Sequence, residues 1–213
     1  FEFEDVTGRA GVDGGEAWSR SATFADIDND GDLDLYVSNL GLNRLYRNNG
    51  DGTFSDVTAE TGTGGNRWTT SCLLADLNGD GLPDLYVVNY LSGADVFMPS
   101  CPPNAPVARA CGPGDFSAAQ DRLFLNSGDG RFRDVTDSSG VMQADGKGLG
   151  AIVADFDGNG RLDLFIANDK TPNFMFRNNG DRTFTDVALA SGVAYTEEGA
   201  DQPKWGSYSP NNE

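Results

Sequence analysis

The chain has 213 residues, a formal net charge of −18 and no histidine. Acidic residues outnumber basic ones by 33 to 15, so the surface repels phosphate groups and anionic lipids, and no nucleic-acid partner is expected. The absence of histidine excludes a Ser-His-Asp triad and a histidine-ligated zinc ion, and no apolar stretch reaches the roughly 20 residues that a membrane span needs.

Two motifs recur along the chain. The first is an acidic loop followed by an apolar run, and its copies cover Asp26–Asn39, Asp76–Asn89 and Asp155–Asn168. The second is a turn related to Asn-Asn-Gly-Asp-Gly, followed by Phe-x-Asp-Val in every copy. Its copies start at Tyr46, Phe124 and Phe176, with a partial copy at Phe3–Thr7. Their spacing gives a repeat of about 50 residues, which is typical of a four-stranded propeller blade.

The motif positions divide the chain into five segments. Residues 1–12 are expected to supply the outer strand of an incomplete blade, and residues 193–213 the start of a further blade or a tail. The three segments between them are predicted blades with one acidic loop each, at 13–62, 63–140 and 141–192. The middle blade carries an insertion at 92–120, where five of the nine prolines concentrate and an irregular loop is predicted.

Short runs on both sides of each acidic loop predict strands. Thr23–Ala25 and Leu35–Val37 flank the first loop, and the runs around the other two loops are similarly apolar and β-rich. No segment has the i, i+3, i+4 pattern of a long helix. The sequence therefore predicts an all-β fold of β-propeller blades, which are four-stranded antiparallel sheets of about 50 residues each, in a partial propeller of about three complete blades. A β-sandwich with accidental internal similarity is the alternative.

The three acidic loops align without gaps and have the donor pattern of a calcium loop. Oxygen-bearing side chains stand at positions 1, 3, 5 and 9, glycine at position 6 permits a sharp bend, and the backbone carbonyl of position 7 can add an oxygen. Asp32, Leu82 and Arg161 would contribute through this backbone carbonyl. Three Ca²⁺ sites are predicted, with these ligands: Asp26, Asp28, Asp30, Asp32 and Asp34; Asp76, Asn78, Asp80, Leu82 and Asp84; Asp155, Asp157, Asn159, Arg161 and Asp163.

Neither an EF-hand nor a set of ordinary turns accounts as well for these loops. An EF-hand would have a bidentate glutamate at position 12 and flanking helices, whereas Val37, Val87 and Ile166 stand there inside strand-like runs. Asp, Asn and Gly also form ordinary turns, but three copies in one register require the same coincidence three times. Mg²⁺ is the less suitable ion because it demands near-octahedral geometry and keeps its waters.

The acidic loops and the Asn-Asn-Gly-Asp-Gly-Thr-Phe turns resemble FG-GAP/VCBS-type calcium-binding β-propeller repeats. The Asp-Leu-Tyr-Val run after the loop and the Cys111-Gly-Pro segment before Asp121 are similar to the cartilage acidic protein (ASPIC/UnbV-associated) group. The resemblance implies calcium-stabilised blades in an extracytoplasmic binding or adhesion scaffold, and it brings no catalytic residue. It also implies a ring of about seven blades, so this chain is expected to be part of a larger propeller. The Phe-Gly and Gly-Ala-Pro elements of the repeat are absent, and integrin-like ligand recognition is therefore not expected.

Cysteine and tryptophan supply the remaining candidates. A disulfide between Cys101 and Cys111 would pin the proline-rich insertion and suits an oxidising compartment, and two free thiols are the alternative. Cys72 is expected to be a buried apolar residue. Trp18 and Trp68 hold equivalent repeat positions; packing between blades is the preferred interpretation, and a sugar-stacking surface is the alternative.

The leading interpretation is a non-enzymatic, calcium-binding β-propeller module of a secreted, cell-surface or periplasmic protein, in which Ca²⁺ is structural. Its partner would be a protein or glycan ligand, or neighbouring blades or chains of the same assembly. Two alternatives stay open. One is the propeller body of a carbohydrate-active enzyme of the polysaccharide lyase or dehydratase type, with Lys147, Lys170, Lys204 or a tyrosine as base. The other is a structural subunit of an extracellular assembly.

Overall fold

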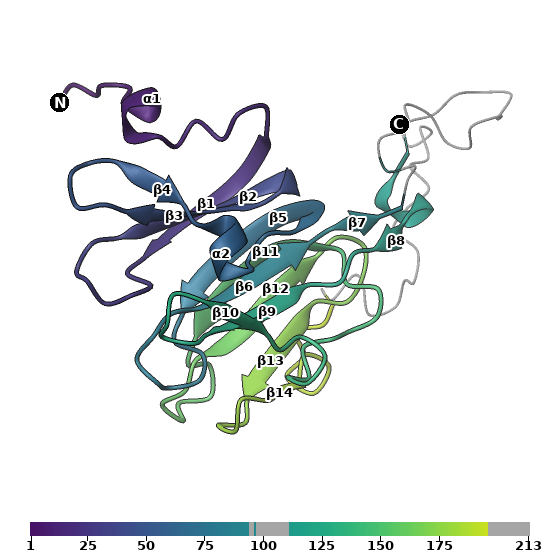
Figure 1. Ribbon diagram of the computed structural model, residues 1–213. Helices are drawn as coiled ribbons and strands as arrows, with labels where there is room; N and C mark the ends of the chain where they lie inside the picture. The colour runs from purple at the N-terminus through teal and green to yellow at the C-terminus, as the bar shows by residue number, and fades with distance from the viewer. Residues whose placement is uncertain (94–95, 97–110, 196–213) are drawn as a thin grey trace, which may run out of the picture.

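The computed structural model describes residues 1–93, 96 and 111–195, which form antiparallel β-sheets with very little helix (Figure 1). The predicted all-β class is confirmed. The strands of the first repeat are β1 (Trp18–Ala25), β2 (Asp34–Leu42), β3 (Arg44–Asn48) and β4 (Phe54–Asp56). Those of the second are β5 (Asn66–Ala75), β6 (Asp84–Asn89), β9 (Arg122–Asn126) and β10 (Phe132–Asp134). Those of the third are β11 (Gly148–Ala154), β12 (Asp163–Asn168), β13 (Phe174–Asn178) and β14 (Phe184–Asp186).

Within each repeat the strands pair with their neighbours in chain order. The β1–β2, β5–β6 and β11–β12 hairpins enclose the acidic loops, and the third and fourth strands of each repeat are joined by the glycine turn. In the first of these turns the Asn49 N–H donates to the Thr53 carbonyl at 3.0 Å, and Gly50 and Gly52 adopt the positive φ that the turn requires. The recurring sequence turn therefore sets the register of each outer hairpin.

The first two repeats do not form separate sheets. The start of β5 pairs with the end of β2: Trp68 lies opposite Leu40, and Arg67 and Asn66 lie opposite Gly41 and Leu42. These two repeats therefore share one eight-stranded sheet. From Thr69 onward β5 pairs with β6 instead, and the register shifts between Thr69 and Ser71. Such a bulge bends a strand and lets it change partner. The third repeat is a four-stranded sheet of its own, and β11 packs beside β5 and β6.

The hydrophobic core lies between successive repeats. One cluster joins Ile27, Tyr36 and Leu45 of the first repeat to Cys72, Leu85, Val87 and Phe124 of the second. The other joins Leu73, Leu77 and Tyr86 of the second repeat to Leu164, Ile166 and Phe176 of the third. The apolar runs that predicted strands thus cover both faces of the middle repeat.

One face of the third repeat has no such cover among the described residues. Ile152 and Phe156 occupy the positions of Leu73 and Leu77, counted from the first aspartate of each loop. Leu73 and Leu77 are buried, whereas 58% of Ile152 is exposed and Phe156 is exposed as well. The surface by which the second repeat packs on the third is therefore not covered by any described residue on the third repeat.

The remaining elements are short. The single-turn helices α1 (Thr7–Ala10) and α2 (Thr58–Thr61) follow equivalent Asp-Val motifs, and each ends at a left-handed glycine. Residues 1–6 form no strand with the described part of the chain, and their role as the outer strand of an incomplete blade stays a prediction. In the insertion, β7 (Leu91–Ser92) pairs with β8 (Ser117–Ala118) and the 3₁₀ turn η1 spans Pro113–Asp115. No helix among the described residues is long and apolar enough to cross a membrane.

Candidate metal sites

The first aspartate of each acidic loop holds the loop backbone in a tight turn. The two carboxylate oxygens of Asp155 accept hydrogen bonds from Gly158 N–H and Gly160 N–H, both at 2.8 Å, and Asp76 accepts from Gly79 and Gly81 in the same way. Asp26 accepts from Gly31 N–H at 2.9 Å. These backbone donors, with Gly160 first, lower the pKa of Asp155 below its usual value. The Asp155 carboxylate is therefore held in its ionised form.

The last aspartate of each loop is buried and joins the loop to the third strand. Asp84 accepts from Leu77 N–H at 3.0 Å and from Asn126 N–H at 2.8 Å. Asp34 and Asp163 make the same pair of bonds, to Ile27 and Asn48 and to Phe156 and Asn178 respectively. Each of the three aspartates is at most 1% exposed.

Burial raises the pKa of two of these aspartates. Desolvation raises the pKa of Asp34 despite its two backbone donors, and it raises the pKa of Asp84 to about 7. The neighbouring carboxylates of each loop raise both values further. Ionising a buried carboxylate beside others is costly unless a cation compensates the charge. A divalent cation in the loop would supply that compensation.

Two of the loops gather three carboxylates into one cluster. Asp26, Asp28 and Asp34 each offer an oxygen within 4.8 Å of the others, and Asp155, Asp157 and Asp163 do the same. In the middle loop Asn78 takes the place of the central aspartate, and its amide oxygen leaves only Asp76 and Asp84 as carboxylates at these positions. The donors are oxygens alone, which fits a hard cation such as Ca²⁺ and does not fit zinc or copper.

Positions 5 and 7 have a local role in the structure. One side-chain oxygen of Asp30, Asp80 and Asn159 accepts a hydrogen bond from the N–H of Asp32, Leu82 and Arg161, at 2.9–3.0 Å. The Arg161 side chain turns away from the loop and donates to the Asn178 carbonyl at 3.1 Å. Coordination by the side chains of position 5 and by the carbonyls of Asp32, Leu82 and Arg161 stays a prediction.

An asparagine of the third strand connects neighbouring loops, a role that the sequence pattern alone did not indicate. Asn126 Nδ2 donates at 2.8 Å to the carbonyl of Ile27 in the preceding loop, and Asn178 Nδ2 donates at 2.8 Å to Leu77 in the same manner. Each of these amides also donates to a carbonyl of its own repeat, that of Pro83 for Asn126 and that of Leu162 for Asn178. Asn48, at the equivalent position of the first repeat, donates to the Leu33 carbonyl in the same way. In the sequence, this connecting residue is the first asparagine of the repeated glycine turn.

The cysteines agree with part of the expectation. Cys72 is a free, buried thiol whose pKa is raised by burial, as expected of an apolar core residue. Cys101 lies outside the described residues, so its disulfide with Cys111 stays a prediction. Residues 196–213, which include most of the predicted further blade or tail, also lie outside them.

Repeated antiparallel sheets with an oxygen-rich loop in each first hairpin define a class of β-repeat protein. Residues 26–87, 110–166 and 155–203 match the FG-GAP-like repeat. These matches cover more than half of the chain, and the protein belongs to this family.

Two similar proteins share only a short stretch with the chain. Cartilage acidic protein 1 of Xenopus tropicalis is 38% identical over 69 residues, which are 31% of this chain and 11% of that protein. Cartilage acidic protein 1 of Homo sapiens is 41% identical over 61 residues, or 29% of this chain and 9% of that protein. The aligned part thus spans about a tenth of these relatives.

A solved structure of an Agrocybe aegerita lectin, from a study of non-reducing terminal N-acetylglucosamine recognition, aligns with 76% of this chain and 36% of the lectin chain. The TM-score is 0.39 and the identity 21%, which is too distant to support an inference about this chain.

Proposed function

We propose that this chain is a calcium-stabilised β-propeller segment that serves as a binding or adhesion scaffold of a secreted, cell-surface or periplasmic protein. The observation that carries the proposal is the pair of three-aspartate clusters, each closed by a buried aspartate. Membership in the FG-GAP-like repeat family supports it. The proposal assigns no catalytic residue to the chain.

The calcium ions act in this proposal as structural ligands. Positions 1, 3 and 9 of each loop would hold one ion, with the middle loop using Asn78 in place of a carboxylate, so that three ions bind in total. The ion would neutralise buried charge and fix the hairpin between the first and second strands. Because it binds the folded state and not the unfolded chain, it would raise the free energy of unfolding.

The propeller arrangement rests on the contact between repeats. The second repeat packs on the first, and the third on the second, through equivalent positions. The open face around Ile152 and Phe156 would receive a further repeat in the same way. The biological partner of the protein would be a protein or glycan bound on the assembled scaffold.

Thermal unfolding with Ca²⁺, Mg²⁺ or EGTA tests the calcium proposal. At a concentration 100 times the Kd, one bound ion adds about 2.7 kcal/mol, which corresponds to a rise of roughly 5–10 °C in Tm for a domain of this size. Asp155→Asn should reduce the Ca²⁺-dependent rise, whereas Asp181→Asn, in the exposed β13–β14 turn, should leave it unchanged. A melting curve that EGTA does not move would contradict the proposal.

A further inference from the structure

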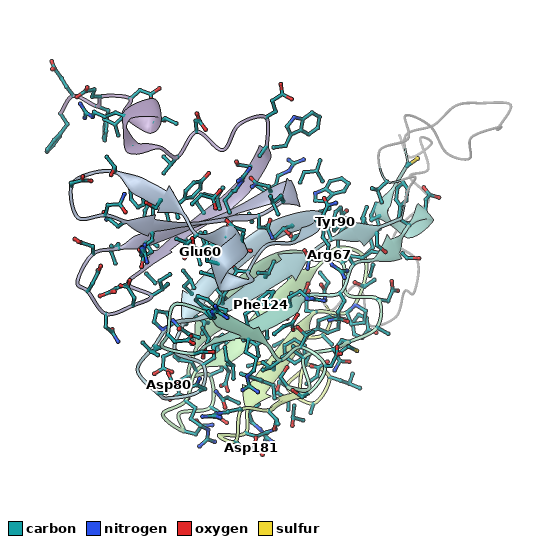
Figure 2. All side chains as sticks on the ribbon, viewed as in Figure 1. Glu60, Arg67, Asp80, Tyr90, Phe124 and Asp181 are labelled. Atoms are coloured by element: carbon teal, nitrogen blue, oxygen red, sulfur yellow. The ribbon has the colours of Figure 1, made fainter. Side chains whose placement is uncertain are left out.

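Trp18 and Trp68 lie on the same side of one sheet, at the end opposite to the acidic loops. Trp18 of β1 pairs with Leu40 of β2, and Leu40 pairs with Trp68 of β5. Side chains at directly paired positions point to the same face, so the two indoles flank Leu40 in a row across three strands. In Figure 2 the neighbouring residues Arg67 and Tyr90 are far from Asp80 and Asp181 in the acidic and glycine turns.

This row forms one wall of a groove of about 700 Å³. Its lining includes Glu16, Trp18, Leu40, Asn66, Arg67 and Trp68. The volume is within the range of small-molecule binding sites. We name this feature the Trp groove.

Trp18 does not pack between the repeats that the structure describes, and its packing against a further blade stays a prediction. Its side chain is 67% exposed, which is unusual for so large an apolar residue. Trp68 is held more firmly: the Tyr90 ring meets it edge-on at 5.2 Å between centroids, and the Arg20 guanidinium lies 5.9 Å from its ring. The groove therefore combines a fixed indole and an accessible one.

The polar lining is balanced in charge, although the chain as a whole is strongly acidic. Glu16 offers carboxylate acceptors, Arg67 offers guanidinium donors, and Asn66 offers both. A lining with one acid, one base, an amide and the Ser92 hydroxyl suits an uncharged ligand that carries many donors and acceptors. To pack on the row of Trp18, Leu40 and Trp68, the same ligand must also present C–H groups to the indole rings.

The strand backbone behind this wall is unsuited to pairing with an extended peptide. At Leu40, Gly41 and Leu42 the backbone of β2 is already paired with Trp68, Arg67 and Asn66 of β5. Recognition must therefore use ring faces and polar side chains. The two tryptophans stand two strand spacings apart, roughly 10 Å, which is a span that two linked pyranose rings can cover.

We propose that the Trp groove binds a neutral saccharide, with one pyranose face stacked on Trp18 and its hydroxyls bonded to Glu16, Asn66 and Arg67. This inference rests on the proposed function as a binding scaffold, and it specifies the ligand class and the site. Trp68 and Tyr90 position the wall against which the second ring lies.

Titration with neutral disaccharides tests the proposal. Cellobiose, lactose and maltose are added to the calcium-loaded chain, and binding is followed by calorimetry and by indole fluorescence. At least one should bind saturably, Trp18→Ala should weaken that binding about tenfold, and Trp18→Phe should retain part of it. Leu189→Ala removes another highly exposed apolar side chain, outside the groove, and should change nothing. Because Trp18 is exposed, its variants should keep the parental melting curve.

Several results would overturn the proposal. These are no saturable binding by any of the three neutral disaccharides, equal binding by Trp18→Ala, or binding only of an anionic hyaluronan disaccharide, of a cationic glucosamine disaccharide or of a proline-rich peptide. The melting temperature of the same samples with and without Ca²⁺ separates the two proposals. A Ca²⁺-dependent rise without sugar binding refutes the saccharide site alone, and sugar binding without that rise refutes the calcium role alone.

Discussion

Replacing Asn178 by alanine should destabilise the fold through a bond between repeats. Asn178 is 3% exposed, and its Nδ2 donates to the Leu77 carbonyl at 2.8 Å and to the Leu162 carbonyl at 3.0 Å. Its Oδ1 accepts from Gly180 N–H at 2.9 Å. Losing the two local bonds costs about 1 kcal/mol, and leaving the buried Leu77 carbonyl without this donor costs about 2 kcal/mol more. The free energy of unfolding should therefore fall by about 3 kcal/mol.

Asn48→Ala is the matched control. Asn48 makes the same two local bonds, to the Leu33 carbonyl at 3.1 Å and from Gly50 N–H at 3.0 Å, but no carbonyl of a preceding repeat in the described chain accepts a second bond from it. Urea unfolding followed by circular dichroism should give a loss of about 1 kcal/mol for this variant. Equal losses for the Asn48 and Asn178 variants would refute the idea that the bond between repeats is the larger contribution.

Three further outcomes are expected. Burial raises the pKa of Asp121 to about 7, so the folded state binds its proton more tightly than the unfolded chain, and urea midpoints should fall as pH rises from about 4 to 7. Asp121→Asn introduces asparagine, the residue that the first repeat has at the equivalent position, Asn43. This variant should make the urea midpoint depend less on pH and should raise the free energy of unfolding at pH 8 by up to about 4 kcal/mol. An unchanged pH dependence would contradict this. Gly148→Ala should cost about 1–3 kcal/mol in the same assay because its Cβ would collide with a β6 side chain, whereas Gly150→Ala, which faces open space, should not. Cys72 should react with a thiol reagent only after unfolding, since burial raises its pKa and hides the sulfur, and rapid labelling at Cys72 itself in the folded chain would disprove it.

The repeats were predictable because their signals are local. Glycine positions, alternating oxygen donors and short apolar runs fix the hairpins around Asp26, Asp76 and Asp155 within a few residues of sequence. The grouping of positions 1, 3 and 9 in the first and third loops follows from the same spacing. Local pattern therefore sufficed for the all-β class and for the position of the acidic clusters.

Contacts between repeats were not predictable from that pattern. The pairing of β5 with β2 depends on a bulge after Thr69, and nothing in the local sequence fixes where the strand changes partner. The exposure of Trp18 depends likewise on what surrounds it in space, because Trp68 at the equivalent position has neighbours that Trp18 lacks. The role of Asn178 required knowledge of a carbonyl 101 positions earlier in the chain.

The bonds of the third-strand asparagines link the buried aspartates into a series. Asp84 is bound by the N–H of Asn126, whose amide holds the loop that Asp34 closes, and by the N–H of Leu77, whose carbonyl is held by Asn178. Asn178 in turn donates its N–H to Asp163. A shift in the position of Asp84 can thus reach the first loop through Asn126 and Ile27, and the third loop through Leu77 and Asn178. This series couples each loop to its nearest neighbour through the shared middle loop. Any coupling between the outer loops must therefore pass through the loop that has two carboxylates, not three, at positions 1, 3 and 9.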